Sequence, residues 1–403
     1  MQIFKKLYCR TFQTMFKLAL PILPYRQPKI VKTDNDIIDV LHKHKINNVL
    51  LVTDKGVYNL GLTKSLETSL QKNNILFSIY NDTIANPTTD NVQSAVNLYN
   101  KNYCDAIIAF GGGSAIDCAK AVGAKIARPQ KPLLKMKGVM KIMKKIPLLI
   151  AIPTTAGTGS ETTLSAVITD SQTRHKYAIN DFPLIPQYAM LNANLTLGLP
   201  KHITSTTGMD ALTHAIEAYI GRTTTRQTRK CALFAVKTIF ENLEEAYNHP
   251  KNFEAREQML IASYNAGVAF TKSYVGYVHA IAHTLGGKYN IAHGFANAII
   301  LPYVLKKYGK SIYKKLWKMG IYAGLFKKNT SLKDGANLFI AKIESMNKAM
   351  DIPKNIPDIK TEDIPELAKT AEKEANPLYP VPVLYTKMQL EQILYTVKNG
   401  SNL

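Results

Sequence analysis

The chain has 403 residues, of which 46% are hydrophobic and 20% charged, and this balance excludes a disordered chain, a collagen and a small disulfide scaffold. The formal net charge is +22, which favours anionic partners such as nucleotides or lipid surfaces. The four cysteines form no CxxC pair, which excludes a zinc ribbon and a thioredoxin motif and indicates a reducing cytoplasmic location.

An amphipathic segment opens the chain, and we treat residues 1–30 as an N-terminal extension. It lacks a secretory signal pattern and any run approaching the ~20 apolar residues of a spanning helix. Seven apolar residues share one helical face: Phe4, Leu7, Tyr8, Phe12, Met15, Phe16 and Leu20. We expect this helix to dock on its own domain or on a partner chain. The alternative is peripheral contact of residues 1–24 with a membrane surface.

Short apolar runs then alternate with helical patterns. The runs predict strands at 49–52, 75–80, 105–110 and 148–152. Amphipathic stretches between them, such as 90–103 and 115–127, predict helices. This alternation indicates an α/β domain over residues 31–200, with a parallel sheet covered by helices on both faces. Residues 165–170 and 176–179 are predicted to be extended and to form a small hairpin.

Helical periodicity dominates after Pro200, and no clear strand is predicted there. We therefore expect an all-helical domain over residues 201–403, with the boundary in 192–200. The predicted helices cover 209–220, 229–246, 254–283 and 293–308, followed by further helices. The proline-rich segment 351–382 is expected to be an irregular connection with short helices.

Two polar loops follow successive predicted strands. Gly111-Gly112-Gly113-Ser114 leads into a helix, where glycines and unpaired backbone N–H groups suit an anion. The second loop, 153–163, carries several threonines and two glycines, which suit phosphate or ribose contacts. In a doubly wound sheet both loops would lie at the carboxyl ends of strands, where ligands bind. Each loop alone could instead be a tight turn or a capped helix start.

Histidines and one aspartate recur at helical spacing in the second half. Asp210 and His214 are four residues apart, and so are His279 and His283, while His293 follows in a loop. A single such residue is more often structural, but several histidines with one carboxylate are typical of a divalent transition-metal site. The pair has no HExxH pattern, which excludes that metalloprotease motif.

These motifs together resemble the iron-containing (group III) alcohol dehydrogenase family, from about residue 30 to the C-terminus. The resemblance is carried by Gly111–Ser114 with Asp117, and by the segments 153–162, 208–219 and 276–302. It implies a dinucleotide-binding α/β domain, a helical domain and an active site between them. It further implies an NAD(H)-linked alcohol dehydrogenase or aldehyde reductase that acts on a small alcohol or aldehyde and forms a homodimer.

The resemblance also assigns roles to individual residues. It implies four metal ligands, for Fe²⁺ with Zn²⁺ as the alternative: Asp210, His214, His279 and His293. His283 matches a catalytic histidine that can relay a proton. The cofactor-binding positions it implies are Asp54, Gly112, Gly113, Ser114, Asp117, Thr154, Thr155, Thr158 and Lys176. A carboxylate at Asp54 repels a 2′-phosphate, which favours NAD over NADP. Asn192 departs from an aspartate that many relatives carry.

Two rival interpretations stay open at this point. Another member of the same superfamily, a glycerol-type dehydrogenase or a dehydroquinate-synthase-like enzyme, shares the fold but usually has a different ligand set. A nucleotide- or lipid-binding protein with a structural metal would use the positive charge and the N-terminal helix to dock. A nucleic-acid partner is not expected, because aromatic residues do not alternate with the basic ones. Phe270, Tyr274 and Tyr277 either narrow a substrate pocket or belong to the core.

Overall fold

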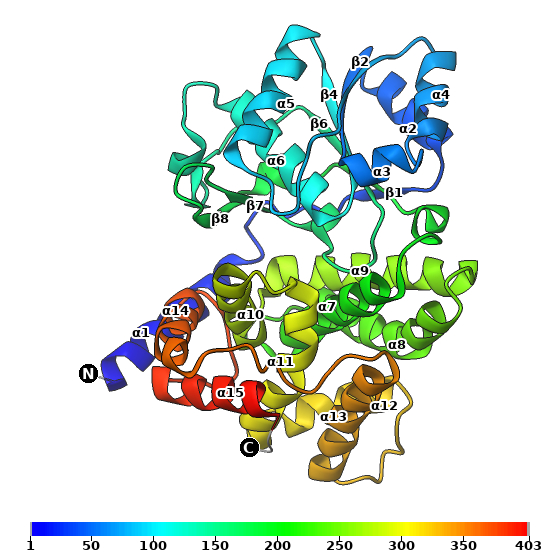
Figure 1. The fold of residues 1–403 in the computed structure, drawn as a ribbon. Coiled ribbons are helices and arrows are strands. Elements are labelled where there is room, and N and C mark those ends of the chain that lie inside the picture. The colour runs from blue at the N-terminus through cyan, green and yellow to red at the C-terminus, as the bar shows by residue number, and fades with distance from the viewer. Residues whose placement is uncertain (1, 401–403) are drawn as a thin grey trace. The chain divides into compact units, whose positions relative to one another are not determined.

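The computed structural model describes residues 2–400, and the chain divides into two compact units. Residues 24–198 form the first unit, while residues up to 23 and from 199 onward form the second. The N-terminal segment thus belongs to the same unit as the C-terminal half of the chain. Figure 1 shows the elements of each unit, which we describe separately.

A six-stranded parallel sheet forms the centre of the 24–198 unit, in the order β1-β9-β6-β4-β2-β3. Its strands are β1 (Lys29–Val31), β2 (Asn48–Val52), β3 (Leu76–Tyr80), β4 (Ala106–Gly111), β6 (Leu148–Pro153) and β9 (Tyr188–Met190). The predicted parallel sheet is confirmed, whereas β1 and β9 were not predicted. From β2 the chain adds β3 on one side and β4 on the other. The strand order therefore reverses between β2 and β4, where doubly wound sheets bind ligands.

Helices cover both faces of this sheet, as the alternation predicts. They are α2 (Asp34–Lys43), α3 (Lys55–Asn59), α4 (Lys64–Lys72), α5 (Thr89–Lys101) and α6 (Gly113–Ala127). Successive strand residues point to opposite faces. Ile107 therefore packs in the core under α5 and α6, while its neighbour Ile108 packs in the core under α2 and α4.

A smaller sheet of β5 (Gly138–Val139), β8 (Lys176–Asn180) and β7 (Ser165–Thr169) completes this unit. β7 and β8 pair antiparallel, which confirms the predicted hairpin. Short 3₁₀ turns lie at η1 (Leu133–Met136), η2 (Ser160–Thr162), η3 (Phe182–Leu184) and η4 (Ala193–Thr196). Asn192 caps η4, because its side-chain oxygen accepts a hydrogen bond from the backbone N–H of Asn194 at 3.0 Å.

The regular elements of the second unit are all helices in its described residues, as predicted. Its first helices are α1 (Gln2–Ala19), α7 (Lys201–Ile220), α8 (Arg226–Asn248), α9 (Phe253–Ser273) and α10 (Tyr277–Tyr289). They are followed by α11 (His293–Tyr308), α12 (Tyr313–Tyr322), α13 (Leu332–Ala349), α14 (Ile364–Ala375) and α15 (Lys387–Asn399), with 3₁₀ turns η5 (Gly309–Ser311) and η6 (Thr361–Asp363). Within the described part of the chain, every helix is too short or too polar to cross a membrane.

One predicted helix was wrong: the stretch 254–283 is divided into α9 and α10. Tyr274 ends α9 with a φ of 60°, which takes the backbone out of the helical region. α10 then starts with its first-turn N–H groups bound to the carboxylate of Glu217. The apolar periodicity runs through both helices, so it could not show this break.

The helix α1 docks on its own unit through a narrow face. Cys9, Gln13 and Leu20 are buried, whereas Phe4 and Leu7 are 77% and 63% exposed. Of the seven residues of the predicted apolar face, Leu20 is buried, Phe16 is partly buried and Phe12 is 37% exposed, whereas the other four are more than half exposed. Polar contacts through Arg10 and Gln13 join the helix to the rest of its unit, together with the packing of Phe16 on Tyr274.

Candidate metal centre and phosphate-binding loops

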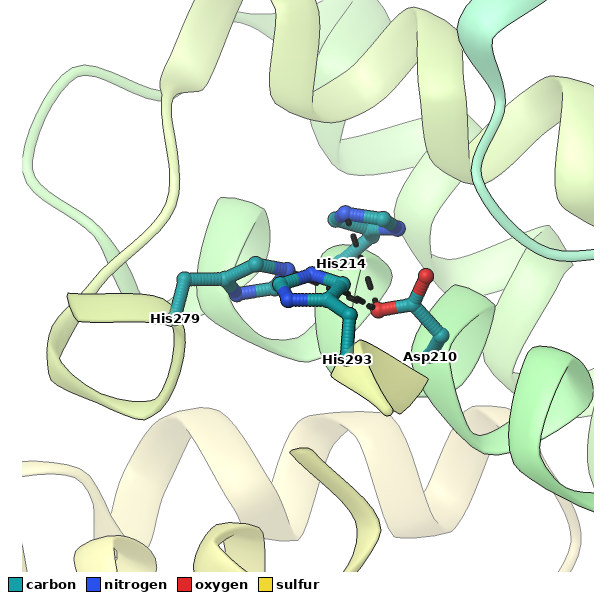
Figure 2. A group of neighbouring side chains, drawn as sticks. All are labelled: Asp210, His214, His279 and His293. Atoms are coloured by element: carbon teal, nitrogen blue, oxygen red, sulfur yellow. Dashed lines mark ion pairs between the residues drawn. The ribbon is translucent and has the colours of Figure 1, made fainter. Parts of the chain in front are cut away.

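Three helices bring the four predicted metal ligands together (Figure 2). α7 supplies Asp210 and His214, α10 supplies His279, and His293 is the first residue of α11. One ligand atom from each residue lies within 4.8 Å of those of the other three. Residues separated by up to 83 positions along the chain thus converge within the reach of a single ion.

A close approach of α11 to α7 places His293 beside Asp210. A Cβ on Gly294 would lie only 2.3 Å from the backbone oxygen of Thr206 and 3.3 Å from the Cβ of Asp210. Only glycine therefore permits this spacing, because real Cβ atoms do not come so near a backbone atom. The glycine after His293 is accordingly part of how the sequence assembles the cluster.

One carboxylate oxygen lies at the centre of the three imidazoles. Oδ1 of Asp210 is 3.5 Å from Nε2 of His293, 3.7 Å from Nε2 of His279 and 4.0 Å from Nε2 of His214. Asp210, His214 and His279 are buried, whereas the side chain of His293 is 36% exposed. The cluster is therefore closed on the α7 side and open on the side of His293.

Burial disfavours the charged forms of Asp210 and His279. Burial raises the pKa of Asp210 to about 7. The hydrogen bond that the Asn297 amide donates to Oδ1 of Asp210 acts in the opposite direction and keeps the pKa from rising further. Burial also holds the pKa of His279 well below its ordinary value, so that ring is neutral. Nε2 of His279 is buried and has no hydrogen-bond partner. Three imidazoles with one carboxylate fit Fe²⁺ or Zn²⁺, and the orphaned Nε2 of His279 is the atom such an ion would bind.

Glu217 contacts the Nδ1 side of the His279 ring and was not predicted from the sequence. Its Oε2 lies 2.6 Å from Nδ1 of His279 and accepts the backbone N–H of Gly276 at 2.7 Å, while its Oε1 accepts that of Val278 at 2.9 Å. A carboxylate at Nδ1 places the ring proton there and leaves the Nε2 lone pair facing Asp210. Its position could have been predicted, because Glu217 is three residues after His214 and therefore lies on the same face of the helix.

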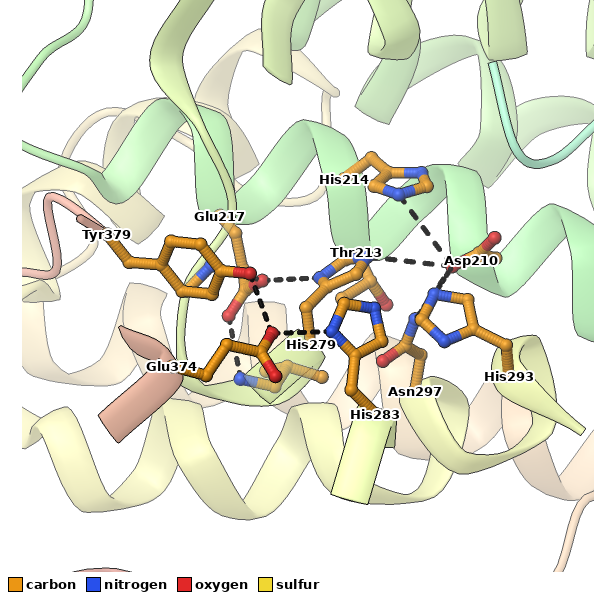
Figure 3. Close-up of polar contacts among 12 residues, drawn as sticks. Asp210, Thr213, His214, Glu217, His279, His283, His293, Asn297, Glu374 and Tyr379 are labelled. Atoms are coloured by element: carbon orange, nitrogen blue, oxygen red, sulfur yellow. Dashed lines mark hydrogen bonds and ion pairs between the residues drawn. The ribbon is translucent and has the colours of Figure 1, made fainter. Parts of the chain in front are cut away.

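His283 lies beside the cluster and is held by residues from the C-terminal region (Figure 3). Its ring stacks on His293, with centroids 5.0 Å apart, and its Nδ1 is 2.6 Å from Oε1 of Glu374. The hydroxyl of Tyr379 donates to the same oxygen at 2.7 Å. Burial alone would raise the pKa of Glu374, but the charge and hydrogen bond of His283 lower it overall. Neither Glu374 nor Tyr379 was predicted.

Of the three aromatic residues considered from the sequence, only Phe270 touches a predicted ligand. Its ring stacks on His214 with centroids 4.0 Å apart. Tyr277 is fully buried, and its hydroxyl accepts the backbone N–H of Tyr385 at 2.9 Å, so it is a core residue. Tyr274 packs edge-on against Phe16 of α1, with ring centroids 5.2 Å apart.

The two glycine- and threonine-rich loops meet in the 24–198 unit. Gly112 precedes α6, and Gly113 and Ser114 form its first turn, where backbone N–H groups lack helical partners. A Cβ on Gly113 would lie 2.8 Å from Cγ2 of Thr158, and one on Gly112 would lie 3.6 Å from Cγ2 of Thr155. The backbone N–H of Thr154 donates to the carbonyl of Gly111 at 3.1 Å. The loops after β4 and β6 thus form one surface.

Asp54 lies beside this surface, at the strand-order reversal. It caps α3, with Oδ1 accepting the backbone N–H of Val57 at 2.9 Å. Its Oδ2 lies 3.4 Å from where a Cβ on Gly111 would be. Asp54 and the loop after β4 therefore flank the same point of the sheet edge.

The other two predicted cofactor positions make contacts with protein groups. Asp117 accepts the hydroxyl of Ser160 at 3.1 Å and the backbone N–H of Val167 at 3.0 Å. Nζ of Lys176 donates to Oδ1 of Asn86 at 2.6 Å. Asp117 thus joins α6 to the loop after β6 and to β7.

Lys120 also contacts the threonine-rich loop, although it was not predicted from the sequence. It is fully buried, and Nζ donates to the carbonyl of Thr163 at 2.8 Å, to its Oγ1 at 2.7 Å and to the carbonyl of Ser165 at 2.8 Å. Burial lowers its pKa to about 8, opposed by Asp117 and Glu161. The side chain therefore ties α6 to the end of the threonine-rich loop.

Lys120→Met is expected to destabilise the protein by about 2–3 kcal/mol, because buried carbonyls lose their donor. Lys125→Met, on the same helix but bonded to partly exposed carbonyls, is the control and should cost under about 1 kcal/mol. Chemical denaturation of both variants measures the difference. Equal stabilities would show that Lys120 does not hold the loop.

A doubly wound sheet with a glycine-rich loop at its strand-order reversal, together with a three-histidine, one-carboxylate cluster, is typical of a metal-dependent dehydrogenase. Family models agree with this class. Residues 31–193 match iron-containing alcohol dehydrogenase, and residues 204–397 match the C-terminal part of the Fe-containing alcohol dehydrogenase family. The chain therefore belongs to the iron-containing alcohol dehydrogenase family and is an alcohol oxidoreductase.

Individual relatives cover nearly the full chain. The chain is 34% identical over 366 residues to 1,3-propanediol dehydrogenase of Citrobacter freundii, covering 90% of this chain and 94% of that one. A solved 1,3-propanediol oxidoreductase matches with a TM-score of 0.88 and 32% identity, covering 93% of this chain and 98% of that one. Sulfoacetaldehyde reductase from Bifidobacterium kashiwanohense, solved in complex with NAD⁺, matches with a TM-score of 0.83 and 27% identity, over 93% and 98% of the two chains.

Proposed function

We propose that the chain interconverts a small alcohol and its aldehyde with NAD(H) and Fe²⁺, Zn²⁺ being the alternative ion. The observation that carries this proposal is the convergence of Asp210, His214, His279 and His293 around one carboxylate oxygen. A divalent cation at such a site lowers the pKa of a substrate hydroxyl and polarises a carbonyl.

The chain's own residues supply the remaining functions. Glu217 keeps the proton of His279 on Nδ1, which leaves Nε2 available as a ligand. His283 is half-exposed and held at Nδ1 by Glu374, so it can pass the proton of the alcohol toward solvent. The loop residues Gly112, Gly113 and Ser114 would bind the pyrophosphate of the cofactor through their backbone N–H groups. A nicotinamide cofactor bound there would supply the hydride donor or acceptor for the substrate carbon.

The decisive experiment is a substrate screen with metal-reconstituted protein. Apoprotein is loaded anaerobically with Fe²⁺ or Zn²⁺ and assayed with primary alcohols, diols and aldehydes against NAD(H) and NADP(H). We expect NADH formation with at least one small alcohol, and faster turnover with Fe²⁺. Stoichiometric metal binding without any turnover would favour instead a binding protein with a structural metal.

Asp54→Ser is expected to raise the ratio of NADP to NAD efficiency by about tenfold or more, because a carboxylate beside a 2′-phosphate costs several kcal/mol. Serine retains a side-chain oxygen that can cap α3. Steady-state kcat/KM with both cofactors measures the ratio, and Asp82→Ser is a control on the same unit. An unchanged ratio would show that Asp54 does not contact the adenine ribose of the cofactor.

A further inference from the structure

The helix α1 holds a proline-rich segment through side-chain donors. The segment, residues 376–382, connects α14 toward α15 and is named here the proline segment. The Arg10 guanidinium donates to the carbonyls of Val381 at 2.8 Å and Pro382 at 3.0 Å. The Gln13 amide donates to the carbonyls of Tyr379 at 2.8 Å and Pro377 at 3.2 Å. Four hydrogen bonds thus join one face of α1 to this segment.

The proline segment depends on such outside donors. Three of its seven residues are prolines, so it has few N–H groups and no regular hydrogen-bond ladder of its own. Four of its carbonyls accept hydrogen bonds from α1, that of Pro380 accepts the backbone N–H of Arg222, and Gln13 is only 3% exposed. The Arg10 side chain also donates to Oε1 of Gln13 at 2.7 Å, which fixes the orientation of the Gln13 amide. The two donors therefore act as one rigid unit.

Tyr379 connects this segment to His283. Its backbone carbonyl accepts a hydrogen bond from Gln13. Its hydroxyl donates to Glu374, which in turn holds Nδ1 of His283, as Figure 3 shows. A second route runs through rings, because Phe16 of α1 packs on Tyr274, whose ring centroid is 6.5 Å from that of Tyr379. In addition, Lys5 pairs with Glu372 at 2.6 Å on the helix that carries Glu374.

We infer that α1 is an intramolecular brace that positions His283, through Gln13, Tyr379 and Glu374, for proton transfer. This inference rests on the proposed function, in which His283 moves the proton of the alcohol. Arg10, Gln13 and Tyr379 are positioning residues, since none of them contacts a metal ligand. The brace explains why a polar face of α1 is buried although the helix also carries a row of apolar side chains.

The test compares Gln13→Ala, Tyr379→Phe and the double variant, with Leu7→Ala as the matched control on the exposed face of α1. Iron-loaded protein is mixed with NAD⁺ and alcohol, and NADH formation is followed in a single turnover. Each single variant is expected to slow this step about fivefold, the equivalent of about 1 kcal/mol for one lost hydrogen bond. Iron content, the KM for NAD⁺ and the Leu7→Ala rate should remain at wild-type values.

The double variant separates positioning from general loosening. If both residues act on Glu374 by one route, the double variant is about as slow as either single one, because the second change has nothing left to remove. Hydrogen–deuterium exchange of the proline segment should accelerate in Gln13→Ala and stay unchanged in Leu7→Ala. Faster exchange with an unchanged single-turnover rate, or multiplying effects in the double variant, would overturn the inference. A wild-type protein that binds iron but oxidises no alcohol would instead overturn the proposed function.

Discussion

His279→Ala is expected to lower kcat/KM by at least about a thousandfold, or ~4 kcal/mol of transition-state stabilisation, because the cation loses its ligand at the buried Nε2. The same change removes the group that Glu217 holds and the ring that stacks on His214, with centroids 4.5 Å apart. Metal content after anaerobic loading with Fe²⁺ or Zn²⁺ should fall well below one ion per chain. Elemental analysis and steady-state kinetics measure the two effects.

Thermal unfolding gives a readout of His279 that does not depend on turnover. A cation at a hundred times its Kd stabilises the folded state by about 2.7 kcal/mol, so Fe²⁺ should raise the Tm of the wild type. The Tm of His279→Ala should not respond to Fe²⁺. His202→Ala, exposed near the start of the same α7 that carries Asp210, is the control and should retain the metal response. Full metal loading and wild-type turnover in His279→Ala would show that His279 is not a metal ligand.

The central strands were predictable because their burial is complete. β4 and β6 are covered on both faces, so each reads as a continuous apolar run in the sequence. β1 has only three residues, with Lys29 and Ile30 exposed, and therefore shows no such run. Its place at the sheet edge is set by pairing with β9, a long-range contact without a local pattern.

Part of the cluster could be predicted from helix spacings, whereas the choice of His279 and His293 rather than His283 as ligands came from the family resemblance. Asp210 and His214 share a face of α7 whatever the rest of the fold does. Glu217 shares that face and could have been found by the same argument. The partner of His283 could not, because Glu374 lies 91 residues away on α14. The break between α9 and α10 was hidden for a related reason, since the carboxylate that binds the first turn of α10 comes from α7.

Glu217→Gln is expected to weaken metal binding by about 10–100-fold, the usual cost of losing a residue that orients a metal ligand. The carboxylate uses both oxygens as acceptors, for two backbone N–H groups and for Nδ1 of His279. A carboxamide has one acceptor atom, its oxygen, and an NH₂ group that can only donate. When its NH₂ faces Nδ1, the imidazole proton moves to Nε2 and blocks the atom that binds the cation. Competition with a chelator of known affinity measures the metal Kd.

The metal effect of Glu217→Gln must be separated from its effect on the fold, because the same side chain caps the first turn of α10. Losing a cap costs about 0.5–2 kcal/mol. That loss is present with or without metal, so denaturation of chelator-treated protein isolates it. Glu241→Gln, on the exposed side of α8, should alter neither quantity. A variant that loses stability but keeps the wild-type metal Kd would show that Glu217 only caps α10. The tautomer of His279 would then be set by other contacts.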